Sequence, residues 1–158
     1  MALRFNDILK RAMVMDVIDR FCTVYSDLCQ VSQEDLANIY SQDVVFIDPI
    51  KAHRGLADVQ SYFAHLLERA QSCRFDITTI IATQPSQTTN ITHVVNWTMY
   101  LNIQKYSNEI TLKGTTQLSV RDDRICYHRD YYDLGQMVYE HIPILRFFIK
   151  KIKARMAQ

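Results

Sequence analysis

From Cys73 onward the chain alternates apolar and polar side chains, and this pattern constrains the fold more than any other feature. One alternating run covers residues 93–103 and a second covers residues 110–120. Alternation with a period of two is typical of antiparallel strands that have one buried face and one wetter face. The sequence therefore predicts four long strands in the second half of the chain.

The first half of the chain has helical spacing instead. Apolar side chains recur at every third or fourth position over residues 5–28, and Ser32 opens a capping sequence for a short second helix through Tyr40. Val44–Asp48 is predicted to be a strand that Pro49 ends, and Leu56–Gln71 a third helix. Three N-terminal helices packed on a curved antiparallel sheet make an α+β domain.

Bulk composition limits the size and class of the protein. A chain of 158 residues with 48% hydrophobic content can bury one sizeable core. We expect one α+β domain over residues 1–135 and a C-terminal helical extension over residues 136–158, packed on the same domain. The net charge of +1 argues against nucleic acid as a partner. Charged residues near the N-terminus interrupt any apolar leader, so we expect a cytoplasmic protein.

Cysteine and histidine spacing favours neither a metal nor a cofactor. The four cysteines form no CxxC pair, and the five histidines form no HxH or HExxH motif. Glycine-rich phosphate loops are also missing from the sequence. We expect no bound metal, no cofactor and thiols in a reducing environment.

Two acidic segments carry the strongest functional signal. Asp48 ends the run Phe46-Ile47-Asp48-Pro49, and a later segment reads His128-Arg129-Asp130-Tyr131-Tyr132-Asp133. A carboxylate within a strand-like apolar pattern is costly to bury unless it is paired, hydrated or used. Two such groups predict a pocket that supports proton transfer.

The order of elements, with the Phe46–Pro49 run and His53-Arg54-Gly55 before a helix, resembles the nuclear transport factor 2-like superfamily. That superfamily includes ketosteroid isomerases, scytalone dehydratases and SnoaL-like polyketide cyclases. The resemblance covers roughly residues 8–135. It implies a cone-shaped α+β fold with a deep apolar pocket between sheet and helices, a small hydrophobic ligand, and a homodimer formed through the sheet.

The resemblance also implies roles for single residues. Asp48 matches the general base of the ketosteroid isomerases, whereas Phe21 and Thr116 stand where that enzyme has its oxyanion-hole tyrosine and aspartic acid. Steroid isomerisation itself is therefore not expected. The ending Tyr132-Asp133-Leu134-Gly135 is similar to the SnoaL-like cyclases, whose catalytic aspartate falls on either Asp130 or Asp133.

The alternation of side chains along a strand and the resemblance together predict a catalytic group and a set of ligand contacts. The catalytic residues would be Asp48, Asp130 and His128, with Asp48 taking a proton next to a carbonyl group. Substrate contacts are expected from Tyr25, Phe21, Phe46, Trp97, Thr116 and Tyr132.

A purely structural role is the competing interpretation for each acidic group. Asp48 would then cap the loop at 52–54 or pair with Arg54, and His128 and Asp130 would form a hydrogen-bonded pair on the sheet. Aromatic side chains such as Phe21, Trp97 and Tyr132 would fill the cavity if the domain served only for interaction.

The C-terminal segment combines apolar residues with cations. Residues 146–155 hold five cations and no acid, which leaves 13 basic and 17 acidic residues in the rest of the chain. One interpretation is a helix across the pocket mouth or a dimer seam. The other is a basic amphipathic helix in weak contact with an anionic membrane surface.

The sequence thus favours a SnoaL-like pocket protein. Its activity would be that of a cofactor-independent isomerase, cyclase or dehydratase acting on a small hydrophobic carbonyl compound through an aspartate base. The alternative is a non-catalytic carrier of a lipid-like ligand, or a dimeric interaction domain.

Overall fold

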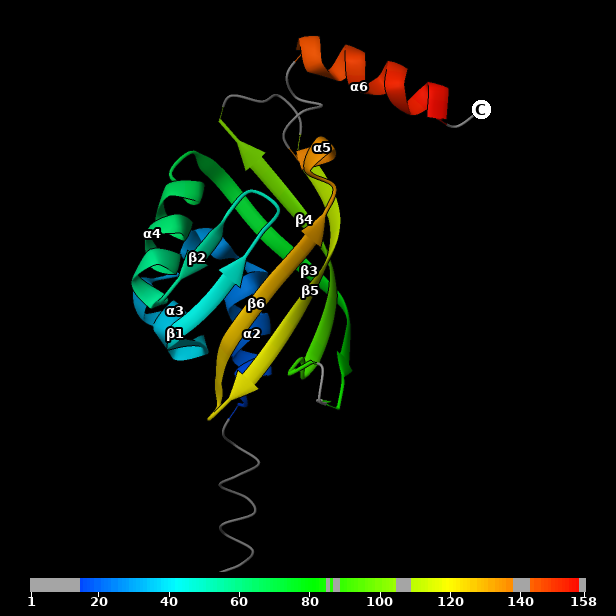
Figure 1. Cartoon of the computed structure of the whole chain (residues 1–158). Coiled ribbons are helices and arrows are strands. Elements are labelled where there is room, and N and C mark those ends of the chain that lie inside the picture. The colour runs from blue at the N-terminus through cyan, green and yellow to red at the C-terminus, as the bar shows by residue number, and fades with distance from the viewer. Residues whose placement is uncertain (1–14, 85, 87–88, 105–108, 138–142, 157–158) are drawn as a thin grey trace, which may run out of the picture.

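A curved six-stranded sheet forms the body of the protein in the computed structural model (Figure 1). The structure describes residues 15–84, 86, 89–104, 109–137 and 143–156, with side chains of 143–146 left out. The strands are β1 (Tyr40–Ile47), β2 (Ala52–Arg54), β3 (Ala70–Ala82), β4 (His93–Ile103), β5 (Ile110–Arg121) and β6 (Arg124–Tyr132). They lie in the order β2-β1-β6-β5-β4-β3.

The four long strands predicted from alternation are confirmed as β3 to β6, and each pairs antiparallel with its neighbour in sequence. The expectation of a fully antiparallel sheet is wrong at one place, because β1 and β6 are parallel. The connection between them runs through α4 and the whole β3–β5 meander. Parallel neighbours need such a long connection, whereas a hairpin can join antiparallel ones.

Helices cover one face of this sheet (Figure 1). They are α2 (Val17–Ser26), the short 3-10 turn η1 (Leu28–Gln30), α3 (Gln33–Ile39) and α4 (Leu56–Leu67). The three predicted helices are thus present, and the part of the first that was expected before Met15 lies outside the described residues. The predicted cap of the second helix is confirmed, since Ser32 and Asp35 form a reciprocal capping box.

Element boundaries differ from the sequence prediction in several places. The first described helix begins at Val17, since Asp16 caps it, and ends at Ser26, and the first strand runs over Tyr40–Ile47 rather than Val44–Asp48. The second helix ends at Ile39 because Tyr40 already pairs in β1, and the third ends at Leu67 because β3 begins at Ala70. The three-residue strand β2 was not predicted, since three residues are too few to show alternation.

A tight turn ties the end of the sheet to the first described helix. Asp122 and Asp123 join β5 to β6 with positive φ angles of 52° and 55°, as a two-residue hairpin requires. The carboxylate of Asp123 accepts a hydrogen bond from the backbone nitrogen of Val17 at 3.1 Å and pairs with Arg20 at 2.9 Å. The hairpin therefore also fixes the start of α2.

The inner face of the sheet is the apolar half of the alternation. Val95, Trp97, Met99 and Leu101 of β4 are buried there. Gly114 lies opposite Trp97 on β5, and a Cβ atom added to it would come within 2.3 Å of the indole ring. Glycine at 114 therefore gives the Trp97 ring the room that it occupies.

Two helices follow the last strand. The short α5 (Leu134–Met137) begins directly after β6, and α6 (Pro143–Met156) extends from the body beyond it (Figure 1). Asp133 accepts a hydrogen bond from the backbone nitrogen of Gly135 at 2.7 Å and forms an ion pair with Lys153 at 3.3 Å. No helix in the described part of the chain is long and apolar enough to cross a membrane.

Candidate functional site

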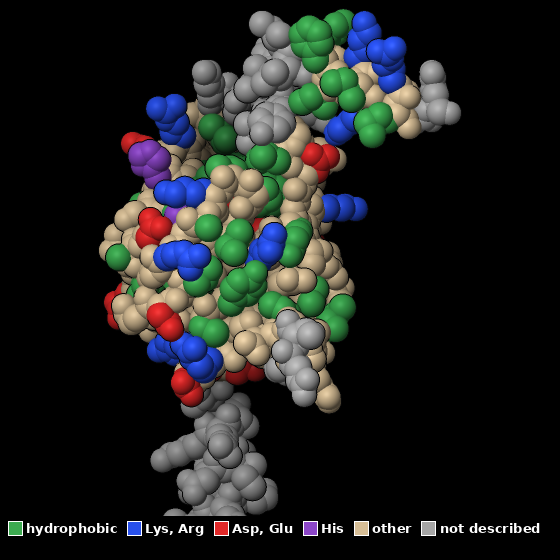
Figure 2. Space-filling view, in the orientation of Figure 1, with side chains coloured by type: hydrophobic (Ala, Val, Ile, Leu, Met, Phe, Trp, Pro, Cys, Tyr) green, Lys and Arg blue, Asp and Glu red, His purple; other side chains and the backbone are tan. Residues whose placement is uncertain are grey.

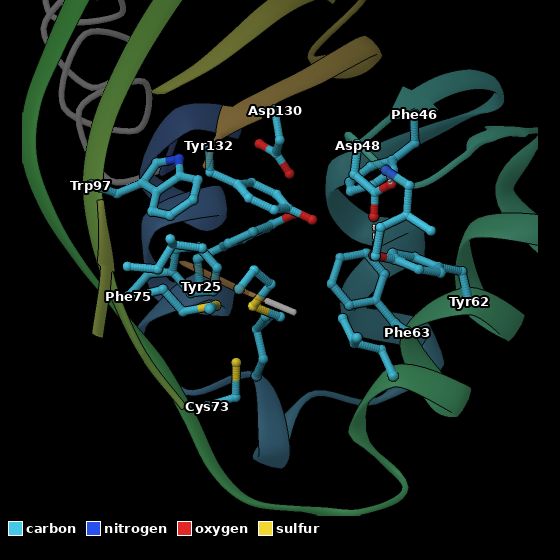
Figure 3. A pocket seen from close by; sticks show the side chains of 16 residues that line it. Tyr25, Phe46, Asp48, Tyr62, Phe63, Cys73, Phe75, Trp97, Asp130 and Tyr132 are labelled. Atoms are coloured by element: carbon cyan, nitrogen blue, oxygen red, sulfur yellow. Dashed lines mark hydrogen bonds between the residues drawn. The ribbon is translucent and has the colours of Figure 1, made fainter. Parts of the chain in front are cut away.

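A hollow lies between the inner face of the sheet and the helices, and Figure 3 shows it from close by. Its polar groups are the carboxylates of Asp48 and Asp130 and the hydroxyls of Tyr25, Tyr62 and Tyr132. Apolar side chains, among them Phe46, Phe63, Phe75, Trp97, Met99 and Leu112, form most of the wall. Its volume is about 50 Å³, or about 520 Å³ when adjoining space open to solvent is included.

Asp130 reaches the hollow from β6, where it shares one face of the strand with His128 and Tyr132. Oδ1 of Asp130 lies 2.9 Å from Nε2 of His128 and accepts a hydrogen bond from the hydroxyl of Thr116. Thr116 stands directly opposite Asp130 on β5. No described residue forms a hydrogen bond with Oδ2, so one carboxylate oxygen is held and the other is available to a ligand.

His128 links Asp130 to groups in the core of the protein. Its side chain is fully buried, and its ring stacks on Phe46 with centroids 4.3 Å apart. Nδ1 of His128 lies 2.9 Å from the hydroxyl of Tyr40, which is 2.6 Å from the hydroxyl of Tyr25. The chain Tyr25–Tyr40–His128–Asp130 therefore starts and ends at side chains that line the hollow.

The directions of these hydrogen bonds follow from Asp130. An ionised carboxylate can only accept, so Nε2 of His128 carries the proton and donates it. In the neutral ring Nδ1 is then an acceptor, which makes Tyr40 its donor and Tyr25 the donor to Tyr40. Every donor in the chain therefore points toward Oδ1 of Asp130.

A second set of contacts holds Asp130 from the other side. The indole Nε1 of Trp97 donates to Oγ1 of Thr116 at 2.8 Å, and the hydroxyl of Thr116 donates onward to Asp130. Thr116 is buried and acts through Asp130 rather than at the wall of the hollow. The position of Trp97 depends in turn on the absence of a side chain at Gly114.

Asp48 enters the hollow from the end of β1, on the same face as Val44 and Phe46. Its Oδ1 accepts hydrogen bonds from the backbone nitrogens of Ile50 at 2.7 Å and Lys51 at 2.8 Å. Its Oδ2 accepts from the hydroxyl of Tyr62 on α4. The carboxylate thus has the turn role considered for it, although its donors precede the 52–54 segment and no ion pair joins it to Arg54 among the described residues.

The tyrosines of the hollow are donors at neutral pH. Burial, followed by the nearby carboxylate of Asp48, raises the pKa of Tyr62 and of Tyr132 far above the usual value, and burial does the same for Tyr25. The charge of Asp130 raises all three further, which places them within its electrostatic reach. Among the described residues the hydroxyl of Tyr132 has no hydrogen-bond partner, and Figure 3 shows it pointing toward the space between the two carboxylates.

The structure brings six of the nine predicted site residues to the wall of the hollow. These are Asp48, Asp130, Tyr25, Phe46, Trp97 and Tyr132. Phe21, Thr116 and His128 are buried beside or behind the wall and do not line it. Phe21 packs on Tyr25 with centroids 4.2 Å apart, and Tyr25, one helical turn later, reaches the hollow instead.

The choice between Asp130 and Asp133 is settled by their positions. Asp130 lines the hollow, whereas the exposed Asp133 caps α5 and pairs with Lys153. Sequence reasoning missed Tyr62, the partner of Asp48. Tyr62 lies among the apolar side chains of α4, and helical spacing alone does not show that a tyrosine there reaches a carboxylate.

The thiol of Cys73, which lies in the wall of the hollow, is unreactive at neutral pH. Burial raises the pKa of Cys73 to about 12, so the thiol stays protonated at neutral pH. Within the described part of the chain no three histidine, cysteine or acidic side chains gather in a way that could hold a metal ion.

Solved structures share this fold. A protein with a ketosteroid isomerase-like fold from Catenulispora acidiphila DSM 44928, crystallised with trimethylamine, is 14% identical at a TM-score of 0.65, covering 76% of this chain and 87% of that one. A protein from Jannaschia sp. CCS1 titled as a SnoaL-like polyketide cyclase is 11% identical at a TM-score of 0.64, covering 77% and 88%. An epoxide hydrolase of M. tuberculosis is 17% identical at a TM-score of 0.61, covering 77% and 83%.

Identities this low establish a common cone-shaped α+β fold and not a common activity. No curated protein matches the chain. The family model described as the SnoaL-like domain matches residues 18–128, which is most of the body of the protein. The chain belongs to the SnoaL-like domain family.

Proposed function

We propose that this protein is a cofactor-independent isomerase, cyclase or dehydratase that acts on a small hydrophobic carbonyl compound, with Asp130 as its general base. The observation that carries the proposal is the asymmetry of the Asp130 carboxylate. Oδ1 is held by His128 and Thr116, while no described residue bonds Oδ2 at the wall of the hollow.

Asp130 replaces Asp48 in the role of base. Both oxygens of Asp48 already accept hydrogen bonds, two from backbone nitrogens and one from Tyr62. A base with an unengaged oxygen at the wall is the better acceptor for a substrate proton, because it loses no existing hydrogen bond. Asp48 instead fixes the loop at 49–51 and the hydroxyl of Tyr62.

The chemical step is a proton transfer next to a carbonyl group. Oδ2 of Asp130 takes the α-proton, and the C–H electron pair moves into the new C=C bond as the carbonyl oxygen becomes an enolate. The hydroxyl of Tyr132, protonated at neutral pH, donates to that oxygen. One such donor is worth about 3–4 kcal/mol in the transition state. Return of the proton to another carbon completes an isomerisation.

The size of the hollow limits the substrate. Most ligand sites have volumes of roughly 300–1,000 Å³, whereas this one has about 50 Å³ before its open mouth is counted. Ile50, Leu66 and Met137 line the partly exposed part of the wall. A bound substrate would occupy the mouth as well as the hollow, displacing these three flexible side chains.

Exchange of α-protons tests the proposal without knowledge of the natural substrate. Small cyclic and aryl ketones, such as cyclohexanone and 2-tetralone, would be incubated with the protein in D₂O and followed by NMR. We expect exchange to be accelerated and to fall at least about a hundredfold in Asp130→Asn. The matched control is Asp76→Asn, which changes an exposed carboxylate on β3 and should leave exchange unchanged. Equal exchange by the wild type and Asp130→Asn with every ketone contradicts the proposal.

A second candidate is binding without turnover, for which the apolar wall is the supporting observation. The same ketones would then shift the fluorescence of Trp97, the single tryptophan, without any α-proton exchange. Exchange that depends on Asp130 excludes this candidate.

A further inference from the structure

The helix α6 exposes large apolar side chains that the rest of the chain does not cover. The exposed fractions are 66% for Phe147, 55% for Phe148, 57% for Ile152 and 83% for Met156. Most large apolar side chains of the body are buried or half-buried, so this concentration of exposed apolar surface on one short helix is unusual. Figure 2 shows these side chains and the neighbouring cations together at one end of the molecule.

Three of these four exposed side chains form a stripe, whereas Phe147 lies away from it, between Lys150 and Lys151 on the helix surface. Phe148, Ile152 and Met156 follow one another at four-residue spacing, which places them on one face of the helix. Lys151 and Arg155 border this stripe on one side and Lys153 borders it on the other, while Lys150 lies on the opposite face. Residues 143–156 contain no acidic side chain.

The position of α6 leaves this stripe available. Among the side chains of α6 that the structure describes, residues 147–156, none lines the hollow. Lys153, at one margin of the stripe, forms an ion pair with Asp133 of the body at 3.3 Å. A partner for the stripe must therefore be apolar at its centre and acidic along the margin that carries Lys151 and Arg155.

We infer that α6 binds the surface of a bilayer that contains anionic phospholipid. Such a surface presents acyl chains to Phe148, Ile152 and Met156 and phosphate groups to the bordering cations at the same time. Lysine and arginine stems are long enough to lie along the apolar region while their charges reach the headgroups. A lipid surface meets these demands without shape complementarity.

Binding of α6 to lipid would also determine where the hollow lies relative to the bilayer. Met137, the last residue of α5, lines the hollow, and α6 begins a short segment later. A protein held on lipid through α6 would bring the hollow close to the bilayer, where apolar compounds collect. The lipid interaction does not rest on the proposed activity, and its test measures binding alone.

Vesicle flotation tests the inference with the full-length protein. We expect it to float with vesicles of phosphatidylcholine and phosphatidylglycerol, to float less as salt is raised, and to stay behind with pure phosphatidylcholine. Lys151→Glu/Arg155→Glu, at the two cations that border the stripe on one side, should lower the partition coefficient at least tenfold, and Phe148→Ala/Ile152→Ala should lower it as well. The charge-matched control, Arg54→Glu/Lys113→Glu, changes two exposed cations of the body and should bind like the wild type.

Three results would overturn the inference. The first is equal flotation with neutral and anionic vesicles, and the second is unchanged flotation of Lys151→Glu/Arg155→Glu. The third is a dimer in sedimentation velocity that Phe148→Ala/Ile152→Ala dissociates, with no vesicle binding by the wild type. That last result would assign the apolar stripe to a second copy of the chain.

Discussion

Nε2 of His128 lies 2.9 Å from Oδ1 of Asp130, two residues along the same face of β6. Because the imidazole is fully buried and stacked on Phe46, it can act on a ligand only through Asp130. His128 is therefore a positioning residue. It holds one oxygen of the carboxylate and leaves the other to the hollow.

The tautomer of His128 is the first testable consequence. We expect ¹⁵N NMR to show a ring proton on Nε2 and none on Nδ1, since Nδ1 accepts from Tyr40. Tyr40→Phe removes that donor and should lower the free energy of unfolding by about 1–3 kcal/mol, because a buried acceptor is left without a partner. A proton on Nδ1 in the wild type would show that the chain of donors does not converge on Asp130.

The hydroxyl of Thr116 links Trp97 to Asp130, and a pair of substitutions isolates it. Thr116→Val keeps the shape of the side chain but removes both hydrogen bonds, whereas Thr116→Ser keeps the hydroxyl. We expect α-proton exchange to fall in Thr116→Val and to be largely retained in Thr116→Ser. Equal exchange by the two variants would mean that Thr116 does not position the carboxylate.

Gly114 supports the same arrangement because its lack of a side chain leaves room for the indole ring of Trp97. In Gly114→Ala the new Cβ would meet the indole of Trp97 at 2.3 Å, so the ring must move and its bond to Thr116 must weaken. Overpacking of this kind costs about 1–3 kcal/mol of unfolding free energy. Urea denaturation followed by the fluorescence of Trp97 measures both effects. A variant with wild-type stability and an unchanged emission maximum would contradict this description of the wall.

Alkaline pH should destabilise the fold through its tyrosines. Burial raises the pKa of Tyr25, Tyr40, Tyr62 and Tyr132 above the usual value near 10. In the unfolded chain these groups lose their protons near pH 10, whereas in the folded chain they keep them. Stability from this source is therefore complete below pH 10 and falls as the pH rises further.

Absorbance at 295 nm checks this expectation. We expect these four of the nine tyrosines to ionise only together with loss of the folded circular dichroism signal. Ionisation of all nine in a chain that stays folded would show that the hydroxyls of the hollow are not buried as described.

Local patterns in the sequence show which residues of the site share a face, and the resemblance was needed to decide which face of the last strand lines the hollow. Alternation along a strand puts Asp48 on one face with Val44 and Phe46, and it puts Asp130 and Tyr132 together on one face of the last strand. Both sets do lie on the inner face. Such patterns work because a strand alternates its side chains whatever its neighbours are.

Pairing between distant segments was beyond these patterns. The parallel contact of β1 with β6 stacks Phe46 on His128 and covers the imidazole, so a residue expected at the wall became buried behind it. The reach of Tyr62 to Asp48 depends in the same way on how α4 packs on β1. Neither relationship has a local signal, because each joins segments that the chain separates by a turn or by several strands.

The central claim is that Asp130, and not Asp48, is the base of this hollow, and one comparison tests it most directly. The rate of α-proton exchange by Asp130→Asn is measured against that of Asp48→Asn with the same ketone, with folding of both verified by circular dichroism. We predict a loss of at least about a hundredfold in Asp130→Asn and a much smaller loss in Asp48→Asn, whose amide oxygen can still accept from Ile50 and Lys51. The reverse order, with exchange abolished in Asp48→Asn and retained in Asp130→Asn, would contradict the claim.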